Sequence, residues 1–251
     1  MNILQTSIIF IYGIICGSFF NVVGRRLPKK ESFATSRSKC PTCSTPIKNR
    51  DLIPVFSYIL LRGKCRNCHQ RISPLYPTIE LLTGVLFAYS YIMFGWSIEF
   101  AGAILLVSLS VIILVSDLLY MIIPDRLLLF FLPLFIILRV LAPLDPWYAS
   151  LIGAIGAYLL IALIILISKG GMGGGDMKLL ALLGILFGYK IIMVFFLSTL
   201  IGALVTIALL ATKTVNRKQP VPFGPFIIMA ALLTYFHGDA LLEWYSGLFF
   251  Y

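Results

Sequence analysis

Charged side chains are scarce in this chain of 251 residues. Asp, Glu, Lys and Arg together make up 12% of it, whereas 60% of the residues are hydrophobic and the mean hydropathy is +0.99. A soluble globular domain carries about a quarter charged residues, so this shortage excludes that class. The length suffices for about eight apolar spans of roughly 20 residues each. We therefore predict an all-α polytopic membrane protein.

Eight apolar segments account for this composition. Some are shorter than the roughly 20 residues that cross a bilayer, and we expect those to be tilted or buried inside the protein. The predicted segments are 3–23, 79–94, 100–119, 127–141, 147–167, 177–189, 191–211 and 222–236.

The first apolar segment lacks a basic stretch before it, and Arg25 and Arg26 follow it instead. A cleavable signal peptide has its basic residues ahead of the apolar run, so this order favours a retained span with its N-terminus outside. We divide the chain into a first transmembrane helix (1–23), a basic cytoplasmic loop (24–78) and a transmembrane domain (79–251).

Basic residues are concentrated in that loop. Of the 20 Lys and Arg residues, 12 lie between Arg25 and Arg71, against only Glu31 and Asp51, so this segment carries +10, the net charge of the whole chain. Positive-inside reasoning places it in the cytoplasm, where it also attracts anionic lipid headgroups. Alternating spans then put Arg139 and Lys190 outside, and the following basic residues inside: Arg126, Lys169, Lys178, Lys213, Arg217 and Lys218.

Four of the five cysteines form two C-x2-C pairs in the loop, Cys40 with Cys43 and Cys65 with Cys68, separated by 21 residues. This is close to the spacing of a tetrathiolate zinc ribbon. A pair of disulfides is the alternative, but a reducing cytoplasm disfavours it. Because four sulfurs leave no open coordination position, we predict a structural zinc ion.

The remaining cysteine and the two histidines point to no further chemistry. Cys16 lies inside the first span, where packing is its expected role. His69 follows the last cysteine pair and could replace a ligand, although four thiolates already complete the site. His237 is expected at the outer interface. Neither histidine makes a convincing catalytic base.

Acids are almost absent from the apolar segments, and Asp117 and Asp176 at the ends of two of them are the exceptions. A charged Asp at the bilayer centre is disfavoured by roughly 3 kcal/mol, so intramembrane acids are candidates for function. Alternating spans bring both residues to the cytoplasmic side. They can therefore meet at one membrane depth.

Five of the six residues from Gly170 to Gly175 are glycine, directly before Asp176. This excludes an ordinary helix interior. Irregular backbone at membrane depth survives only beside protein or a water-filled cavity, so we expect this segment to line a wet site that an extended substrate can approach. A phosphate-binding loop is less favoured, because the G-x-x-x-x-G-K-[ST] pattern is lacking and an acid would repel phosphate.

The other acidic stretch runs from Asp117 to Asp125. Asp125 follows Pro124 at the start of the fourth span. There it is expected to cap the helix and offset its positive end.

Six motifs follow one another over nearly the whole length of the chain. They are Gly17-Ser-Phe-Phe-Asn21-Val-Val-Gly-Arg25-Arg-Leu-Pro28, the cysteine pairs, Ile72-Ser-Pro-Leu-Tyr-Pro77-Thr-Ile-Glu80-Leu-Leu-Thr-Gly84, the Asp117 to Asp125 segment, Gly173-Gly-Gly175-Asp176-Met-Lys178-Leu, and Pro222-Phe-Gly224-Pro225-Phe. In this order they resemble the type IV prepilin peptidases, a family of GxGD-type intramembrane aspartyl proteases. By this resemblance Asp117 and Asp176 match the catalytic aspartates, and Asp125 matches a frequent, non-catalytic acid. Leu119 departs from the pattern, because many members carry an acid there.

The resemblance implies a bacterial inner or sole cell membrane and a substrate of pilin-like precursors. These have a short basic leader, a Gly before the cleavage site and a hydrophobic helix. Two neighbouring carboxylates share one proton, so one activates water while the other protonates the scissile carbonyl. Many members also methylate the new N-terminus from S-adenosylmethionine. Since the basic loop would repel a basic leader, Glu80 or Asp125 is expected to receive it.

Two alternatives come from other classes. A transporter could bind a proton or cation at the intramembrane acids, with the zinc module as a regulator. Against it, both acids lie at one membrane side, and the Gly-rich segment has no inverted repeat. A membrane-tethered nucleic-acid binder rests on the basic loop alone, whose aromatic residues are too scattered for base stacking: Phe33, Phe56, Tyr58 and Tyr76.

Overall fold

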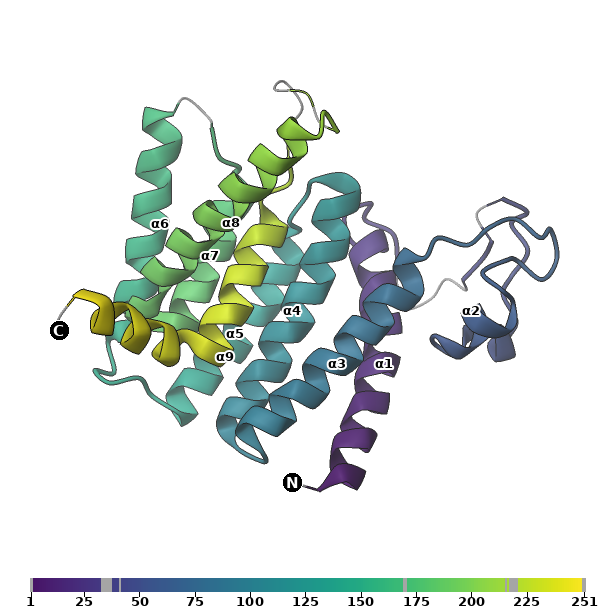
Figure 1. Cartoon of the computed structure of the whole chain (residues 1–251), viewed down its shortest axis with the longest axis horizontal. Coiled ribbons are helices and arrows are strands. Elements are labelled where there is room, and N and C mark those ends of the chain that lie inside the picture. The colour runs from purple at the N-terminus through teal and green to yellow at the C-terminus, as the bar shows by residue number, and fades with distance from the viewer. Residues whose placement is uncertain are drawn as a thin grey trace. The chain divides into compact units, whose positions relative to one another are not determined.

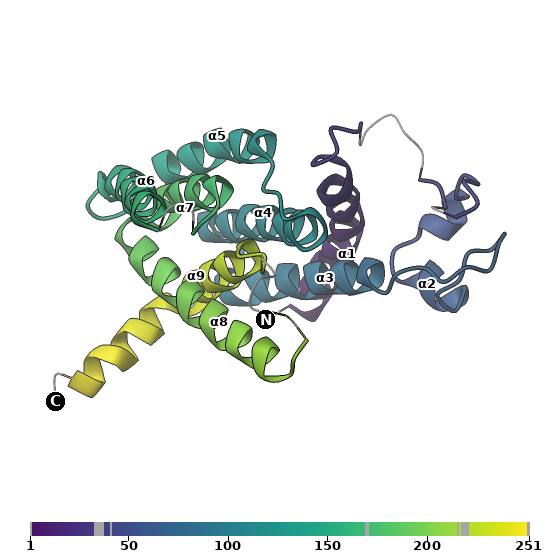
Figure 2. The same cartoon turned by 90° about the horizontal axis from the view of Figure 1, so that it is seen from above.

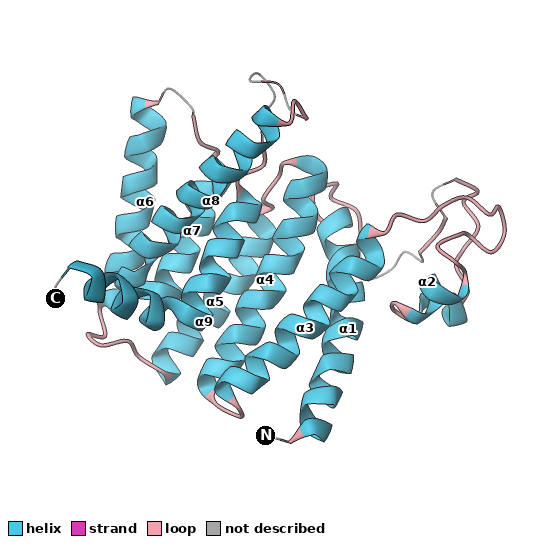
Figure 3. Ribbon diagram, in the orientation of Figure 1, coloured by secondary structure: helices cyan, strands magenta, loops and turns pink. Residues whose placement is uncertain are grey.

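The computed structural model describes residues 2–32, 38–40, 42–168, 171–214, 216 and 221–249. In these ranges the chain forms helices and loops, and its only β-type pairings are two isolated bridges (Figure 3). It divides into two compact units, Met1–Phe100 and Ala101–Tyr251. Some residues considered above lie outside the described ranges: Phe33, Lys169, Gly170, Arg217 and Lys218.

The first unit consists of two long helices and the connection between them (Figure 1). Helix α1 (Ile3–Arg26) packs along α3 (Leu75–Phe94), and the connection contains a 3-10 turn, η1 (Asn49–Leu52), and the short helix α2 (Phe56–Leu60). A Cβ atom on Gly13 would lie 2.8 Å from the Cα atom of Gly84. Glycines therefore allow α1 and α3 to approach closely, as is common between membrane helices.

The second unit contains six long helices. Helix α4 (Ile98–Tyr120) begins just before the unit boundary, and α9 (Gly224–Phe249) ends the described chain. Between them lie α5 (Asp125–Leu141), α6 (Ala149–Ile167), α7 (Gly174–Phe187), the 3-10 turn η2 (Gly188–Lys190) and α8 (Ile191–Ala211).

The eight long helices correspond to the eight predicted apolar segments, so the prediction of an all-α polytopic membrane protein is confirmed. Six stretches of the described residues are long and apolar enough to cross a membrane. The eight long helices give only six candidate spans for two reasons. Helix α5 has only 17 residues, and α7 and α8 form one continuous apolar stretch of 38 residues that Gly188, at a φ of +55°, breaks in two.

Helix α7 is the short interior helix that the segment lengths suggested. Its Leu179, Leu183 and Leu186 are at most 1% exposed, and α5 and α6 both pack against it (Figure 2). At its C-terminal end, Nε and Nη2 of Arg139 donate hydrogen bonds of 3.0 and 2.7 Å to the carbonyl oxygen of Leu186. Because the last carbonyls of a helix lack partners within it, these bonds fasten α5 to α7.

Candidate active site and metal centre

Asp117 lies in the last turn of α4 and is only 5% exposed. Its Oδ2 atom accepts a hydrogen bond of 2.9 Å from the backbone N–H of Gly224, the first residue of α9. A Cβ atom on Gly224 would lie 2.6 Å from that oxygen. Only glycine therefore lets the start of α9 approach the carboxylate closely enough to donate to it.

Asp176 lies in the first turn of α7 and is half-buried. Gly173 is the residue before the helix, and its backbone N–H donates a hydrogen bond to the Asp176 carboxylate. This is the arrangement of the acid in a capping box, in which the third helical residue bonds back to the residue that precedes the helix. The positive end of the helix also favours a negative charge there.

The three glycines before Asp176 differ in how much room they have. A Cβ atom on Gly173 would lie 3.1 Å from Oδ2 of Asp176, and one on Gly175 would lie 3.2 Å from Cβ of Ile123 in the connection between α4 and α5. A Cβ atom added to Gly174 would meet no heavy atom within 4 Å. The G-x-G-D pattern thus has a physical basis, since the two crowded positions flank an open one.

The structure brings the two aspartates together. The C-terminal end of α4 and the N-terminal ends of α7 and α9 lie at the same end of the second unit, toward the top of Figure 1. The carboxylates of Asp117 and Asp176 are close enough to repel one another when both are charged.

Helix α7 is too short to span a bilayer alone. Its 14 residues cover about 21 Å, roughly 9 Å less than the hydrocarbon core. The non-helical backbone at Gly171–Gly173 precedes it. The sequence predicted irregular backbone at this place. Such backbone needs polar or protein surroundings at membrane depth, and the nearby carboxylate of Asp176 is a polar neighbour.

Asp125 is the first residue of α5, and its carboxylate forms an ion pair with Lys178 on α7. The Nζ atom donates to both carboxylate oxygens at 2.9 Å, and both side chains are about half exposed. The N-cap position belongs to Pro124, so no side-chain capping bond forms there. Asp125 nevertheless remains in the first turn, where its charge suits the helix end.

Two further residues of the sequence motifs, Pro222 and Glu80, lie in different places. Pro222 is two residues before α9. Glu80 belongs to α3 of the first unit, where it is 7% exposed and its Oε2 accepts a 2.7 Å hydrogen bond from the backbone N–H of Val55. The Ser18 hydroxyl donates to the same carboxylate. Glu80 therefore fastens the interhelical connection to α3.

The four cysteines of the connection form one cluster. The sulfur atoms of Cys40, Cys43, Cys65 and Cys68 all lie within 4.8 Å of one another, and those of Cys40 and Cys68 are 3.8 Å apart. Four sulfurs at about 2.3 Å from a zinc ion lie roughly 3.8 Å from each other. The cluster thus has the size of a tetrahedral metal site, and all five cysteines of the chain are free of disulfides.

The two cysteine pairs share one backbone geometry. The N–H of Ser44 donates to the carbonyl of Cys40, and the N–H of His69 donates to that of Cys65, at 2.9 and 3.0 Å. Ser44 and His69 each have a φ of +56°. His69 is therefore the turn residue that matches Ser44, and it does not belong to the four-sulfur cluster. The equal offset from each first cysteine was the sequence signal for this role.

The surroundings of Cys43 favour its metal-binding form. Hydrogen bonds from the side chain and backbone of Thr45 lower the pKa of the Cys43 thiol to about 6. The thiolate is the species that binds a metal ion, so these hydrogen bonds favour metal binding by Cys43.

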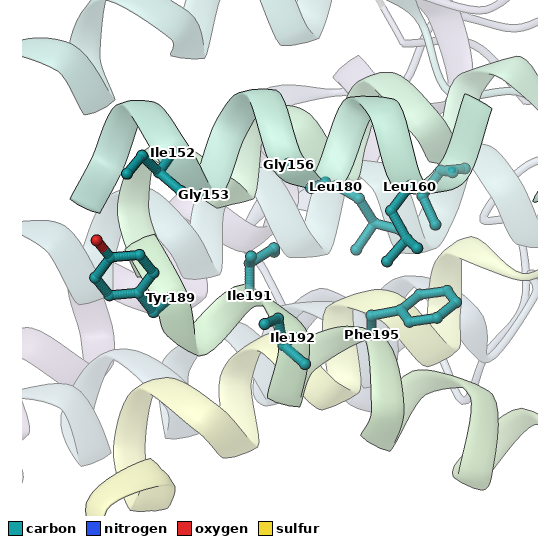
Figure 4. Close-up of a pocket in the computed structure, with 11 residues that line it drawn as sticks. Ile152, Gly153, Gly156, Leu160, Leu180, Tyr189, Ile191, Ile192 and Phe195 are labelled. Carbon is teal, nitrogen blue, oxygen red and sulfur yellow. The ribbon is translucent and has the colours of Figure 1, made fainter. Parts of the chain in front are cut away.

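Two hollows in the second unit are separate from the aspartate pair. One, of about 190 Å³, lies between α6, α7 and the start of α8, and the hydroxyl of Tyr189 is a rare polar group in it (Figure 4). The other, of about 420 Å³, lies between α5, α6 and α7, with Asp125 and Lys178 among its lining residues. Neither is lined by Asp117 or Asp176, and the first contains no acid or base. The acid pair therefore lies outside both hollows.

Comparison with known proteins covers most of the chain. Residues 11–94 match the bacterial peptidase A24 N-terminal domain, and residues 104–207 match the type IV leader peptidase family. A prepilin leader peptidase/N-methyltransferase of Bacillus subtilis is 43% identical, over 95% of this chain and 97% of its own length. Proteins of the same description from Aeromonas salmonicida and Pseudomonas aeruginosa are 33% and 32% identical, over 96% and 93% of this chain and 94% and 90% of their own lengths.

No solved structure matches the chain. The similarity to these relatives extends over both units, so it spans the cysteine pairs and the aspartate segments of this sequence. From this extent of similarity we conclude that the chain belongs to the type IV leader peptidase family.

Proposed function

We propose that this protein is a membrane-embedded aspartyl endopeptidase that removes the basic leader of type IV prepilins and pilin-like precursors. Cleavage follows a Gly at the cytoplasmic membrane face. The observation that carries the proposal is the meeting of Asp117 and Asp176 at one end of the helices, each held by a glycine backbone N–H. The family assignment supports it, whereas the ion-transport alternative gains no support from that assignment.

In this mechanism the ionised aspartate takes a proton from a water molecule, whose oxygen attacks the scissile carbonyl carbon. The protonated partner donates its proton to the carbonyl oxygen, giving a tetrahedral diol. When the diol collapses, the C–N bond breaks, the leaving amine takes a proton from one acid, and a diol hydroxyl gives its proton to the other acid as the carbonyl re-forms. No covalent acyl-enzyme forms, and the pair returns to its starting state with one proton.

The hydrogen bond from Gly224 suits this chemistry. It keeps one oxygen of Asp117 occupied and orients the other, as fixed donors do in preorganised sites. The start of α9 would therefore hold the acid in place throughout the reaction.

The charge pattern supports an orientation with the zinc module and both aspartates on the cytoplasmic side and the N-terminus outside. We assign the protein to a bacterial inner or sole cell membrane. Asp125 is the better candidate for receiving a basic leader, because it is exposed and its ion-pair partner Lys178 lies two residues after Asp176 on α7. The Glu80 carboxylate is buried and already accepts two hydrogen bonds.

We assign a structural zinc ion to the four cysteines, whose sulfur spacing and count fit it. Bound zinc would tie the two cysteine pairs together and so order the connection between α1 and α3. The relatives' description as N-methyltransferases supports methylation of the new N-terminus, with S-adenosylmethionine as the donor. The described residues form no strand-loop-helix nucleotide fold, so no residue is assigned to that donor.

The test is cleavage of a pilin-type precursor by purified, detergent-solubilised protein. Asp117→Ala and Asp176→Ala should abolish cleavage while remaining monodisperse. Their isosteric partners, Asp117→Asn and Asp176→Asn, should also be inactive although they leave the packing unchanged. Asp239→Asn is the matched control, because this acid forms a surface ion pair with Lys190, which follows the C-terminal end of α7, the end opposite Asp176. Persistent cleavage by both folded Asn variants would reject the aspartate mechanism.

Loss of Cys40 or Cys65 should have a different outcome. We predict that Cys40→Ser or Cys65→Ser impairs folding or methylation more than intrinsic proteolysis, since the metal site is remote in sequence from the aspartates. Metal content and methyl transfer are measured beside cleavage. Full retention of both activities in a metal-free variant would contradict a role for the module.

A further inference from the structure

Helix α2 presents its apolar residues outward. Phe56 is 58% exposed, and Ile59 and Leu60 are each 66% exposed. The polar Ser57 of the same helix faces inward: it is 5% exposed and its hydroxyl donates to the carbonyl of Arg50 at 3.0 Å. This is the reverse of what a surface helix in water requires, and exposed apolar patches of this kind mark sites of interaction.

The apolar face extends into the turn before α2. Leu52 and Ile53 of that turn are 44% and 50% exposed. We define the apolar face by these five side chains: Leu52, Ile53, Phe56, Ile59 and Leu60. Basic residues flank it on both sides along the chain, Lys48 and Arg50 before it and Arg62 and Lys64 after it.

The depth of α2 follows from a hydrogen bond within the first unit. Val55, the residue directly before α2, donates its backbone N–H to Glu80 at 2.7 Å. Glu80 is five residues after Leu75, where α3 begins, and therefore about 7.5 Å along that helix. Because α3 is long and apolar enough to span a membrane, its start marks one surface. Interfacial helices bury their apolar face about 5–10 Å into the headgroup and acyl boundary.

From these observations we infer that the apolar face is a membrane-surface anchor that inserts among the lipids of an anionic bilayer. The flanking Lys and Arg side chains reach the phosphates, as basic residues beside an anionic surface do. Lipid is the partner that the charges favour, because the segment from Arg25 to Arg71 carries +10. Both ends of the connection continue into candidate spans, which keeps α2 at the surface.

The anchor would tether the cysteine module to the bilayer. Two contacts would then hold it: the metal ligands within the module, and α2 in the lipid. This inference depends on the membrane assignment and on the first unit alone, so it stands or falls independently of the aspartate mechanism.

The experiment measures contact between α2 and lipid in the full-length protein. Trp96→Phe, Trp147→Phe and Trp244→Phe remove the native tryptophans, and a single tryptophan is then introduced as Phe56→Trp or Ile59→Trp. The control is Thr42→Trp, an exposed position in the first cysteine pair. Each protein is reconstituted into phosphatidylcholine vesicles with or without phosphatidylglycerol, and nitroxide-labelled phospholipids are the quenchers. Metal content verifies that the module is folded.

We expect nitroxides near the headgroup to quench the fluorescence of the Phe56→Trp and Ile59→Trp proteins about threefold more than that of the Thr42→Trp protein, and deep nitroxides to have less effect. Phosphatidylglycerol should strengthen the quenching. A triple variant that combines Arg50→Gln, Arg62→Gln and Lys64→Gln should lose this increase. Equal quenching in all three proteins would overturn the inference. The inference would also be overturned if the emission of the two α2 variants shifted to the blue only after a precursor peptide was added. The apolar face would then bind protein and not lipid.

Discussion

The backbone N–H of Gly224 donates a 2.9 Å hydrogen bond to Oδ2 of Asp117 across 107 residues of sequence. It joins the last turn of α4 to the first residue of α9. A side chain on residue 224 would occupy the place of the acceptor oxygen. Residue 224 must therefore be glycine for its N–H to reach the carboxylate of Asp117.

We predict that Gly224→Ala reduces the rate of precursor cleavage about 100-fold, because displacing a catalytic group by about 1 Å has an effect of that order. A Cβ atom 2.6 Å from Oδ2 must move either the carboxylate or the start of α9. The control is Gly156→Ala in α6, where the added Cβ meets no atom within 4 Å. Initial rates of the two purified variants are compared, and similar rates would show that the close approach is dispensable.

The Gly-rich segment allows a graded test. Gly175→Ala should slow cleavage about tenfold, because its Cβ would lie 3.2 Å from Cβ of Ile123 and push the first turn of α7, with Asp176, out of place. Gly174→Ala should leave the rate within about twofold and raise the midpoint of thermal unfolding slightly, since it restricts the unfolded chain without a clash. The reverse order of effects would contradict this explanation of the G-x-G-D pattern.

Asp125 should distinguish basic from neutral leaders. We expect Asp125→Asn to lower cleavage of a basic-leader precursor about fivefold more than that of a neutral-leader precursor, since an exposed charge affects binding modestly. Lys178→Met should shift this preference in the opposite direction, because it frees Asp125 from its ion pair. Asp239→Asn is the control. The same loss for both precursors would mean that Asp125 does not recognise the leader.

The ion pair between Asp51 and Arg66 should give the cysteine module a pH-dependent stability. Arg66 donates hydrogen bonds of 3.2 and 3.0 Å from Nε and of 2.7 Å from Nη2 to the carboxylate and thereby lowers the pKa of Asp51. Because the folded pKa lies below the unfolded one, the stabilisation is complete above about pH 4 and is lost as the pH falls further.

Amide hydrogen exchange within the module is the measurement. Asp51→Asn should exchange about fivefold faster than wild type at pH 7, whereas at pH 3 the two should become more alike because the wild-type carboxyl is then increasingly protonated. Arg66→Met should reproduce the pH 7 result. A difference that persists unchanged at pH 3 would rule out the ion pair as its cause.

Local signals carried much of what the sequence revealed. The order of apolar segments predicted eight long helices, since hydropathy acts on each segment independently of its neighbours. The spacing of Cys40, Cys43, Cys65 and Cys68 predicted the metal cluster, because a tight turn fixes the two cysteines of each pair. The ordered motifs predicted the family, which the comparisons confirmed.

The partners of individual side chains were less accessible. The position of Asp125 after a proline suggested a helix cap, yet its carboxylate bonds to Lys178 on another helix. Glu80 was one of the two acids proposed to receive a basic leader, and it is buried and bonded to Val55. Each outcome depends on which segments pack together, and helical periodicity is the same whichever neighbour a helix has.

By itself, the sequence determined that this protein is a polytopic membrane protein of the type IV leader peptidase family with a four-cysteine module and two acids in apolar surroundings. Composition, hydropathy and short-range spacing contain that information. Only the tertiary structure decided that Gly224 holds Asp117, that Gly175 must be small beside Ile123, and that α2 exposes its apolar side. These contacts join segments distant in sequence, and the packing of helices in three dimensions selects among the many pairings that a linear pattern permits.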